Sequence, residues 1–193
     1  DLSGIIALGE AVVVSKSLTS VDSSNCGISV VGVTEVAKFI SAGAVLTTLR
    51  CGSNPGMVGE LYPSGSLKTP DVHIEALQEL LKALKPSGVT ELDISAIGIG
   101  PKGADHVADY VRDARAVLTD VNMSGNPLTG KMYDGKPVDG KDISGVSALF
   151  PVMTKVIKLN VSECGLGPTS MPELAKLVRD ATAVLTDVNM AGN

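Results

Sequence analysis

The sequence has very few aromatic residues. Its 193 residues include no tryptophan, two phenylalanines and three tyrosines, so aromatic residues make up 3% of the chain while hydrophobic residues make up 44%. The core must therefore be built from leucine, isoleucine, valine and alanine. Because tryptophan and tyrosine supply many of the strongest anchors of protein interfaces, a binding surface on this chain has few such anchors available.

A basic cluster, a long apolar run and an even number of cysteines are also missing. A formal net charge of -5 without a basic cluster argues against a nucleic-acid partner. No apolar run reaches the roughly 18 residues that a membrane-spanning helix needs, so we expect no membrane span. An odd number of cysteines disfavours a disulfide framework. We expect Cys26, Cys51 and Cys164 to be buried and reduced, which favours a cytoplasmic location.

What the sequence does contain is a recurring spacing, clearest between Leu118 and Leu128. Apolar residues stand at Leu118, Val121 and Met123, an asparagine stands at Asn126, and Leu128 closes the pattern L-x-x-L-x-L-x-x-N-x-L. Residues two apart point to the same face of a strand, so Val121 and Met123 face inward, while the residues between them face solvent. The Asn126 side chain can pair with buried backbone groups of the turn that follows.

Six copies of this spacing cover the chain, beginning at Leu18, Leu46, Val89, Leu118, Val156 and Leu185. Intervals of 28 or 29 residues alternate with longer ones, so the full unit is a pair of copies that begins at Asp1, Asp71 and Asp142. The longer intervals contain inserts at 55–70 and 127–141. Each insert is predicted to form a short hairpin that carries one tyrosine, and both are predicted to project from the same edge.

Helical spacing between the strands predicts an α/β fold. The expected helices cover residues 5–14, 33–40, 74–84, 104–115, 146–153 and 171–181, and Pro151 interrupts the fifth. One copy cannot bury its apolar edge alone, so the copies must stack. We therefore expect one domain over residues 1–193, of about six coils, as a fragment of a longer array. Uncapped ends would permit end-to-end self-association.

These residues resemble the ribonuclease-inhibitor-like type of leucine-rich repeat. The resemblance rests on the 28–29-residue copies, on the loops 26–28 and 164–166 that look like that family's C-G-L, and on the residue at each turn. The turn positions are Cys26, Asn54, Ile97, Asn126, Cys164 and Asn193. Ile97, which has no hydrogen-bonding side chain, and Ser23, which is polar at an inward position, depart from the pattern. The resemblance implies a curved horseshoe with a parallel concave sheet, convex helices and a protein-binding role without a catalytic motif.

One glycine motif offers an alternative function. Gly98, Gly100 and Gly103 satisfy G-x-G-x-x-G between a strand and a helix, with Asp120 at 22 residues from Gly98, which is the outline of a dinucleotide-binding loop. A similar loop recurs at 164–170, however, and the strand before the motif is half polar rather than apolar throughout. A loop of the repeat is the favoured interpretation, and a nucleotide-binding enzyme using residues 98–103 is the alternative.

The candidate metal ligands are poorly arranged. Asp134, Asp139 and Asp142 lie close in sequence, but their spacing is not that of an EF-hand and lysines stand between them. His73 and His106 fall on different predicted helices without partner motifs. We expect no metal, no cofactor and no catalytic residue.

The leading prediction is a non-enzymatic protein-interaction scaffold, with a purely structural spacer as a further alternative. The outward strand positions form a mildly acidic surface that includes Asp93, Asp120, Asn122, Asn160 and Asp187. Tyr62 and Tyr133 on the inserts are the better anchors for a partner protein, because the strands present no aromatic residue.

Overall fold

A computed structural model describes residues 3–15, 17–43, 45–181 and 185–193, and contains one six-stranded parallel sheet. Along the sheet, each strand lies beside the one that precedes it in the chain, apart from the two hairpins. The strands in order are β1 (Ser20–Asp22), β2 (Thr48–Arg50), β5 (Glu91–Asp93), β6 (Asp120–Asn122), β9 (Lys158–Asn160) and β10 (Asp187–Asn189). All six strands fall at the predicted copies, and the α/β fold with a parallel sheet is confirmed.

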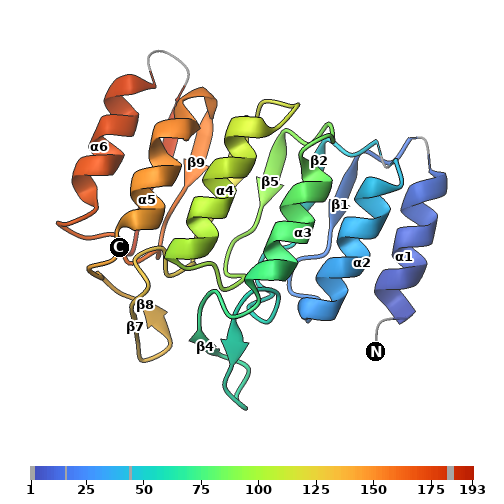
Figure 1. The fold of residues 1–193 in the computed structure, drawn as a ribbon, viewed down its shortest axis with the longest axis horizontal. Helices are drawn as coiled ribbons and strands as arrows, with labels where there is room; N and C mark the ends of the chain where they lie inside the picture. The colour runs from blue at the N-terminus through green and yellow to red at the C-terminus, as the bar shows by residue number, and fades with distance from the viewer. Residues whose placement is uncertain (1–2, 16, 44, 182–184) are drawn as a thin grey trace.

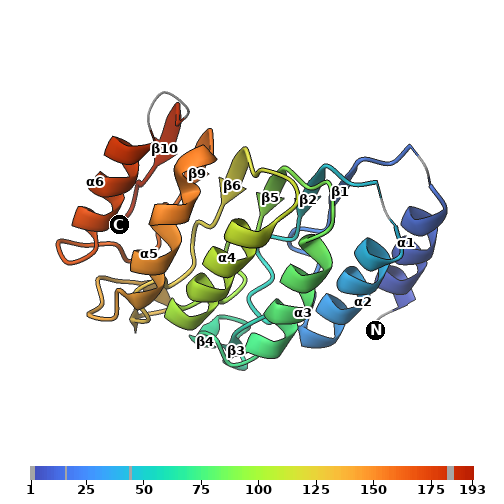
Figure 2. The same cartoon turned by 45° about the horizontal axis from the view of Figure 1, so that its top comes forward.

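The helices lie together on one side of this sheet (Figures 1 and 2). They are α1 (Ser3–Val14), α2 (Val30–Ser41), α3 (Ile74–Leu84), α4 (Pro101–Asp113), α5 (Ser144–Leu149) and α6 (Met171–Asp180). A 3₁₀ helix, η1 (Phe150–Lys155), continues α5. The change occurs at Phe150, next to the expected interruption at Pro151, because proline has no N–H to donate to the preceding turn. None of the described helices is long and apolar enough to cross a membrane.

Both inserts form hairpins, and Figure 1 shows them projecting from the same edge of the molecule, as predicted. The first pairs β3 (Glu60–Leu61) with β4 (Leu67–Thr69), and the second pairs β7 (Met132–Tyr133) with β8 (Lys136–Pro137). Asp134 and Gly135 at the second turn have φ values of 49° and 72°. Two consecutive left-handed residues of this type are typical of a tight hairpin turn.

The core lies between the sheet and the helices, where the central residues of neighbouring strands stand in register. Val21, Leu49, Leu92, Val121 and Leu159 are all buried and paired in line. Each strand thus contributes one layer of aliphatic side chains, which is how a core without tryptophan is filled.

The cysteines divide into two groups. Cys51 and Cys164 are buried, as predicted, but Cys26 is exposed, so its prediction is wrong. The reason is its position after β1, which is the end strand of the sheet and has a neighbour on one side only.

Ser23, the polar residue at an inward position, is buried despite its polarity, because its Oγ donates to the Arg50 carbonyl oxygen at 3.1 Å.

Three asparagines join the turns that follow the strands. Asn126 is fully buried; its Oδ1 accepts from the N–H groups of Ile97, Gly98 and Ile99 at 3.0–3.1 Å. Its Nδ2 donates to the carbonyl oxygens of Ile94 and Met123 at 2.8 and 2.9 Å. Ile97 therefore needs no side-chain hydrogen bond of its own, because Asn126 satisfies its turn from the next strand.

Asn54 and Asn193 make the same connection in the other two pairs of strands. Asn54 accepts from the N–H of Ile28 and donates to the Ser23 carbonyl oxygen, while Asn193 accepts from Cys164 and Leu166. The pairing of copies predicted from the sequence is thus built from hydrogen bonds. Asp1, expected to begin the first pair, lies outside the described residues.

Candidate functional site

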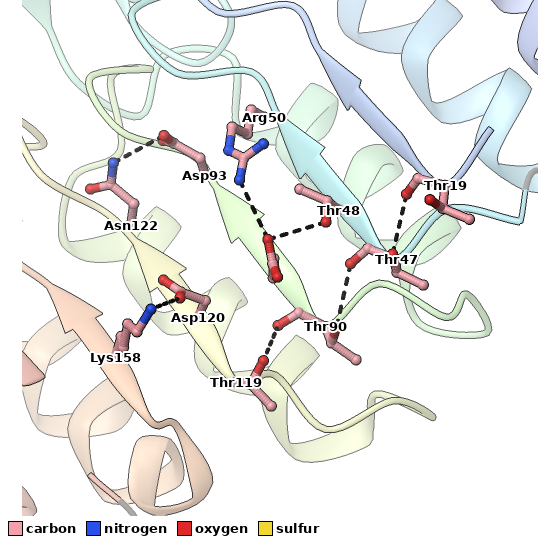
Figure 3. A network of polar contacts seen from close by, with 11 residues as sticks. Thr19, Thr47, Thr48, Arg50, Thr90, Asp93, Thr119, Asp120, Asn122 and Lys158 are labelled. Carbon is pink, nitrogen blue, oxygen red and sulfur yellow. Dashed lines mark hydrogen bonds and ion pairs between the residues drawn. The ribbon is translucent and has the colours of Figure 1, made fainter. Parts of the chain in front are cut away.

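The sheet face opposite the helices, here called the open face, presents the outward side chains of the six strands. Charged and polar groups on it contact one another across neighbouring strands (Figure 3). Glu91 Oε2 accepts from Thr48 Oγ1 at 3.1 Å and lies 3.4 Å from Arg50 Nη2. On the other side, Lys158 Nζ lies 3.4 Å from Asp120 Oδ2. Both cations of this face are therefore paired with carboxylates, while Asp22, Asp93 and Asp187 form no ion pair with any described residue.

The last outward residue of most strands also closes a local turn. Asp93 Oδ1 accepts from the Ser95 N–H, Asn122 Oδ1 from the Ser124 N–H, and Asn160 Oδ1 from the Ser162 N–H. Asn122 Nδ2 donates in addition to Asp93 Oδ2 at 3.0 Å. Asn122 was expected to point freely into solvent, but it is half-buried, because its side chain serves the turn and the neighbouring strand.

A row of threonines, not anticipated from the sequence, runs along the other end of the strands (Figure 3). Each threonine hydroxyl donates to the backbone carbonyl oxygen of the preceding strand's threonine: Thr47 to Thr19, Thr90 to Thr47, and Thr119 to Thr90. The signal was present, since a threonine follows the first apolar residue in most copies of the repeat. These hydroxyls stabilise the sheet and are not free to contact a ligand.

A hollow on the open face has a volume of about 210 Å³ and is lined by Arg50, Glu91, Asp93, Asp120 and Asn122, with Leu92. Small-molecule pockets usually have volumes of about 300–1,000 Å³ and mainly apolar walls. The hollow is smaller and mostly polar, which does not suit a small ligand. Asp187, which was also predicted to bind a partner, does not line this hollow; it lies exposed on the open face, on the end strand β10.

The hairpin edge is different, because its aromatic side chains are exposed. Tyr62 is 49% exposed and Tyr133 is 74% exposed, so neither is consumed by packing within its own hairpin. Between the hairpins lies a groove of about 590 Å³. It is bounded by the end of β4, the start of β7 and the start of α4, and it contains residues of both inserts.

The glycine motif at the start of α4 already holds a carboxylate of the protein. Asp71 accepts hydrogen bonds from the N–H groups of Gly100, Lys102 and Gly103 at 2.7, 2.9 and 3.1 Å. A Cβ on Gly100 or Gly103 would lie 2.6 or 2.7 Å from an Asp71 carboxylate oxygen, and one on Gly98 would meet the Gly59 backbone at 2.5 Å. The glycines thus make room for the first insert and for Asp71, which follows it.

This arrangement counts against a nucleotide at residues 98–103. A phosphate at a helix start needs free backbone N–H groups. Here Asp71 already accepts hydrogen bonds from the N–H groups at the start of α4, and Asn126 accepts those of the preceding turn. The half-buried Asp71 carboxylate would also repel a phosphate. Burial raises the pKa of Asp71, while the three backbone hydrogen bonds and Lys102 oppose that rise.

The candidate metal ligands remain apart. The Asp142 carboxylate accepts from the N–H and hydroxyl of Ser144, which lowers its pKa. His106 Nε2 lies 3.1 Å from Gln78 Nε2. Within residues 3–15, 17–43, 45–181 and 185–193, no three His, Cys, Asp or Glu side chains are grouped so that they could hold a metal ion.

Comparison with known proteins gives one distant structural likeness and no family. No family model matches the sequence, and no curated protein matches it. A solved structure described as "Leiomodin-1 Actin-Binding Site 2 (ABS2)" is similar, with 19% sequence identity and a TM-score of 0.44 over 71% of this chain and 72% of that chain. A likeness at this level carries no argument about function.

Proposed function

We propose that this chain is a non-enzymatic protein-interaction scaffold, built as a leucine-rich repeat solenoid of the ribonuclease-inhibitor-like type. Three observations support the repeat architecture: the strands follow chain order in one sheet, the helices share one side of it, and an asparagine bridges each pair of turns. Neighbouring units that contact only each other are typical of solenoids.

The observation that carries the scaffold function is the hairpin edge. Two inserts on one edge each present an exposed tyrosine, and other residues of both inserts line one groove. Tyrosine offers a large contact area and a hydroxyl at low conformational cost, which makes it a frequent anchor at interfaces. The open face is the weaker candidate, since both of its cations and several of its other polar groups already contact each other and no aromatic residue stands on its strands.

The test compares capture of partner proteins by matched variants. Tyr62→Ser/Tyr133→Ser removes both anchors, while Val117→Ser/Val178→Ser removes two exposed apolar residues elsewhere, at 51% and 55% exposure. We expect a partner that is retained by the wild type and by the valine variant but lost by the tyrosine variant, with unchanged thermal midpoints. Quantitative mass spectrometry of the captured proteins measures this.

A variant of the open face completes the design. If the partner is lost only when Asp93, Asp120 and Asn122 are replaced together, the open face is the binding site and the hairpin edge is not. If no protein distinguishes any variant from the wild type, the chain is a structural spacer and the proposal fails.

A further inference from the structure

The groove between the hairpins has a chemical character that the sequence does not reveal. Its apolar lining includes Pro70 after β4, Met132 of β7 and Pro101 at the start of α4. Around these apolar residues stand Lys102, Lys131 and Lys141. Its volume of about 590 Å³ lies within the usual range for a bound ligand or peptide segment.

The three lysines are exposed and available. None of them forms an ion pair with any residue in the described part of the chain, although eight such pairs occur elsewhere on the surface. Three lysines and two aspartates line the groove, so its lining has a formal charge of +1 on a protein whose net charge is -5. A local reversal of charge of this kind steers oppositely charged partners.

The two carboxylates beside the lysines are already engaged. Asp71 binds the backbone N–H groups at the start of α4, and Asp142 binds the backbone and hydroxyl of Ser144. Neither carboxylate forms an ion pair with Lys102, Lys131 or Lys141 among the described residues, so the lysines remain open to an external anion. Because Asp71 occupies the helix start, the lysine side chains would have to hold that anion.

We infer that this groove binds an extended, acidic segment of a partner protein. The inference rests on the proposed scaffold function and gives that partner a chemistry. Side chains alternate along an extended peptide, so aspartate or glutamate can reach the lysines while the residues between them cover Pro70, Pro101 and Met132. A single-stranded nucleic acid fits less well, because none of the residues that line the groove is aromatic and bases bind by stacking.

The test uses the whole chain and fluorescein-labelled synthetic peptides, with binding followed by fluorescence anisotropy. One peptide alternates glutamate with leucine, and its control replaces every glutamate with glutamine. We expect the acidic peptide to bind, to weaken as salt is raised, and to bind about tenfold less tightly to Lys102→Gln/Lys131→Gln/Lys141→Gln, as the loss of three exposed ion pairs implies.

A second triple variant controls for the loss of charge. Lys82, Arg115 and Lys155 are also exposed and outside any ion pair among the described residues, and none of them lines the groove. Their replacement by glutamine should leave the affinity within about twofold, because screening limits the effect of distant charges. Thermal midpoints of both variants establish that they remain folded.

Three results would overturn the inference. The glutamine peptide could bind as tightly as the acidic one, the two triple variants could lose affinity equally, or oligothymidylate or phosphatidylserine vesicles could bind more tightly and lose binding in the groove variant. The last result would assign the groove to a phosphate-bearing polyanion. If a partner lost by the tyrosine variant is kept by the groove variant, the scaffold proposal stands and only the acidic segment is refuted.

Discussion

Replacing Asn126 with alanine should be among the most destabilising single changes in this chain. The side chain makes five hydrogen bonds to buried backbone groups, three as acceptor and two as donor. One oxygen cannot bond three N–H groups at full strength, so about four effective bonds are lost. Since an unsatisfied buried group costs about 1–3 kcal/mol, and water entering the vacated space recovers part of the loss, we expect about 3–5 kcal/mol.

Asn122→Ala is the matched control, because Asn122 is only four positions away and also hydrogen-bonded. Its partners are the Ser124 N–H, the Ser124 hydroxyl and Asp93 Oδ2, all in half-buried positions that water can reach. We expect a loss of about 0.5–1 kcal/mol.

Urea denaturation followed by circular dichroism measures both changes. We expect the dependence of the unfolding free energy on urea concentration to be the same in both variants as in the wild type. Global stability of a domain is only about 5–15 kcal/mol, so Asn126→Ala should lower the midpoint conspicuously. Equal midpoints for Asn126→Ala and Asn122→Ala would refute the idea that the buried asparagine is what holds neighbouring turns together.

Three further predictions concern the hairpin edge and the cysteines. Gly100→Ala places a Cβ 2.6 Å from Asp71 Oδ2 and should lower the thermal midpoint by several degrees, as calorimetry would show. Because burial raises the pKa of Asp71 above its ordinary 3.8, the wild type should lose stability relative to Asp71→Asn as pH rises through and above that value. Urea midpoints measure this, and a wild-type midpoint that gains on that of Asp71→Asn over this range would contradict it. Burial raises the pKa values of Cys51 and Cys164 to about 12, so a thiol reagent at neutral pH should modify Cys26 alone until denaturant is added.

Sequence spacing was sufficient to place the strands and most of the helices. Inward residues such as Val121 and Met123 stand two apart next to an asparagine turn, so strand and turn are specified within about ten residues of chain. Boundaries were less accurate: α4 begins at Pro101 rather than at residue 104, because proline is well suited to the first turn of a helix.

Features that depend on how neighbouring strands meet could not be predicted in the same way. Asp71 reaches the start of α4 from 29–32 residues away, and the groove brings together lysines from one helix and one insert region. Cys26 was misplaced for a related reason: its local sequence matches that of Cys164, and only its position at the end of the sheet exposes it.

The order of strands in the sheet has a consequence for how this chain folds. Each strand pairs only with its predecessor and successor in the sheet, and the Asn126 bonds that link turns span 27–32 residues. The entropic cost of closing a loop rises only slowly with the length of chain enclosed. The strand pairs and the Asn126 hydrogen bonds each join neighbouring units, so they can form before more distant segments of the chain are in place. The rate-limiting nucleus can therefore form at any adjacent pair of strands and grow in both directions, so that changes at opposite ends of the sheet should alter unfolding kinetics independently.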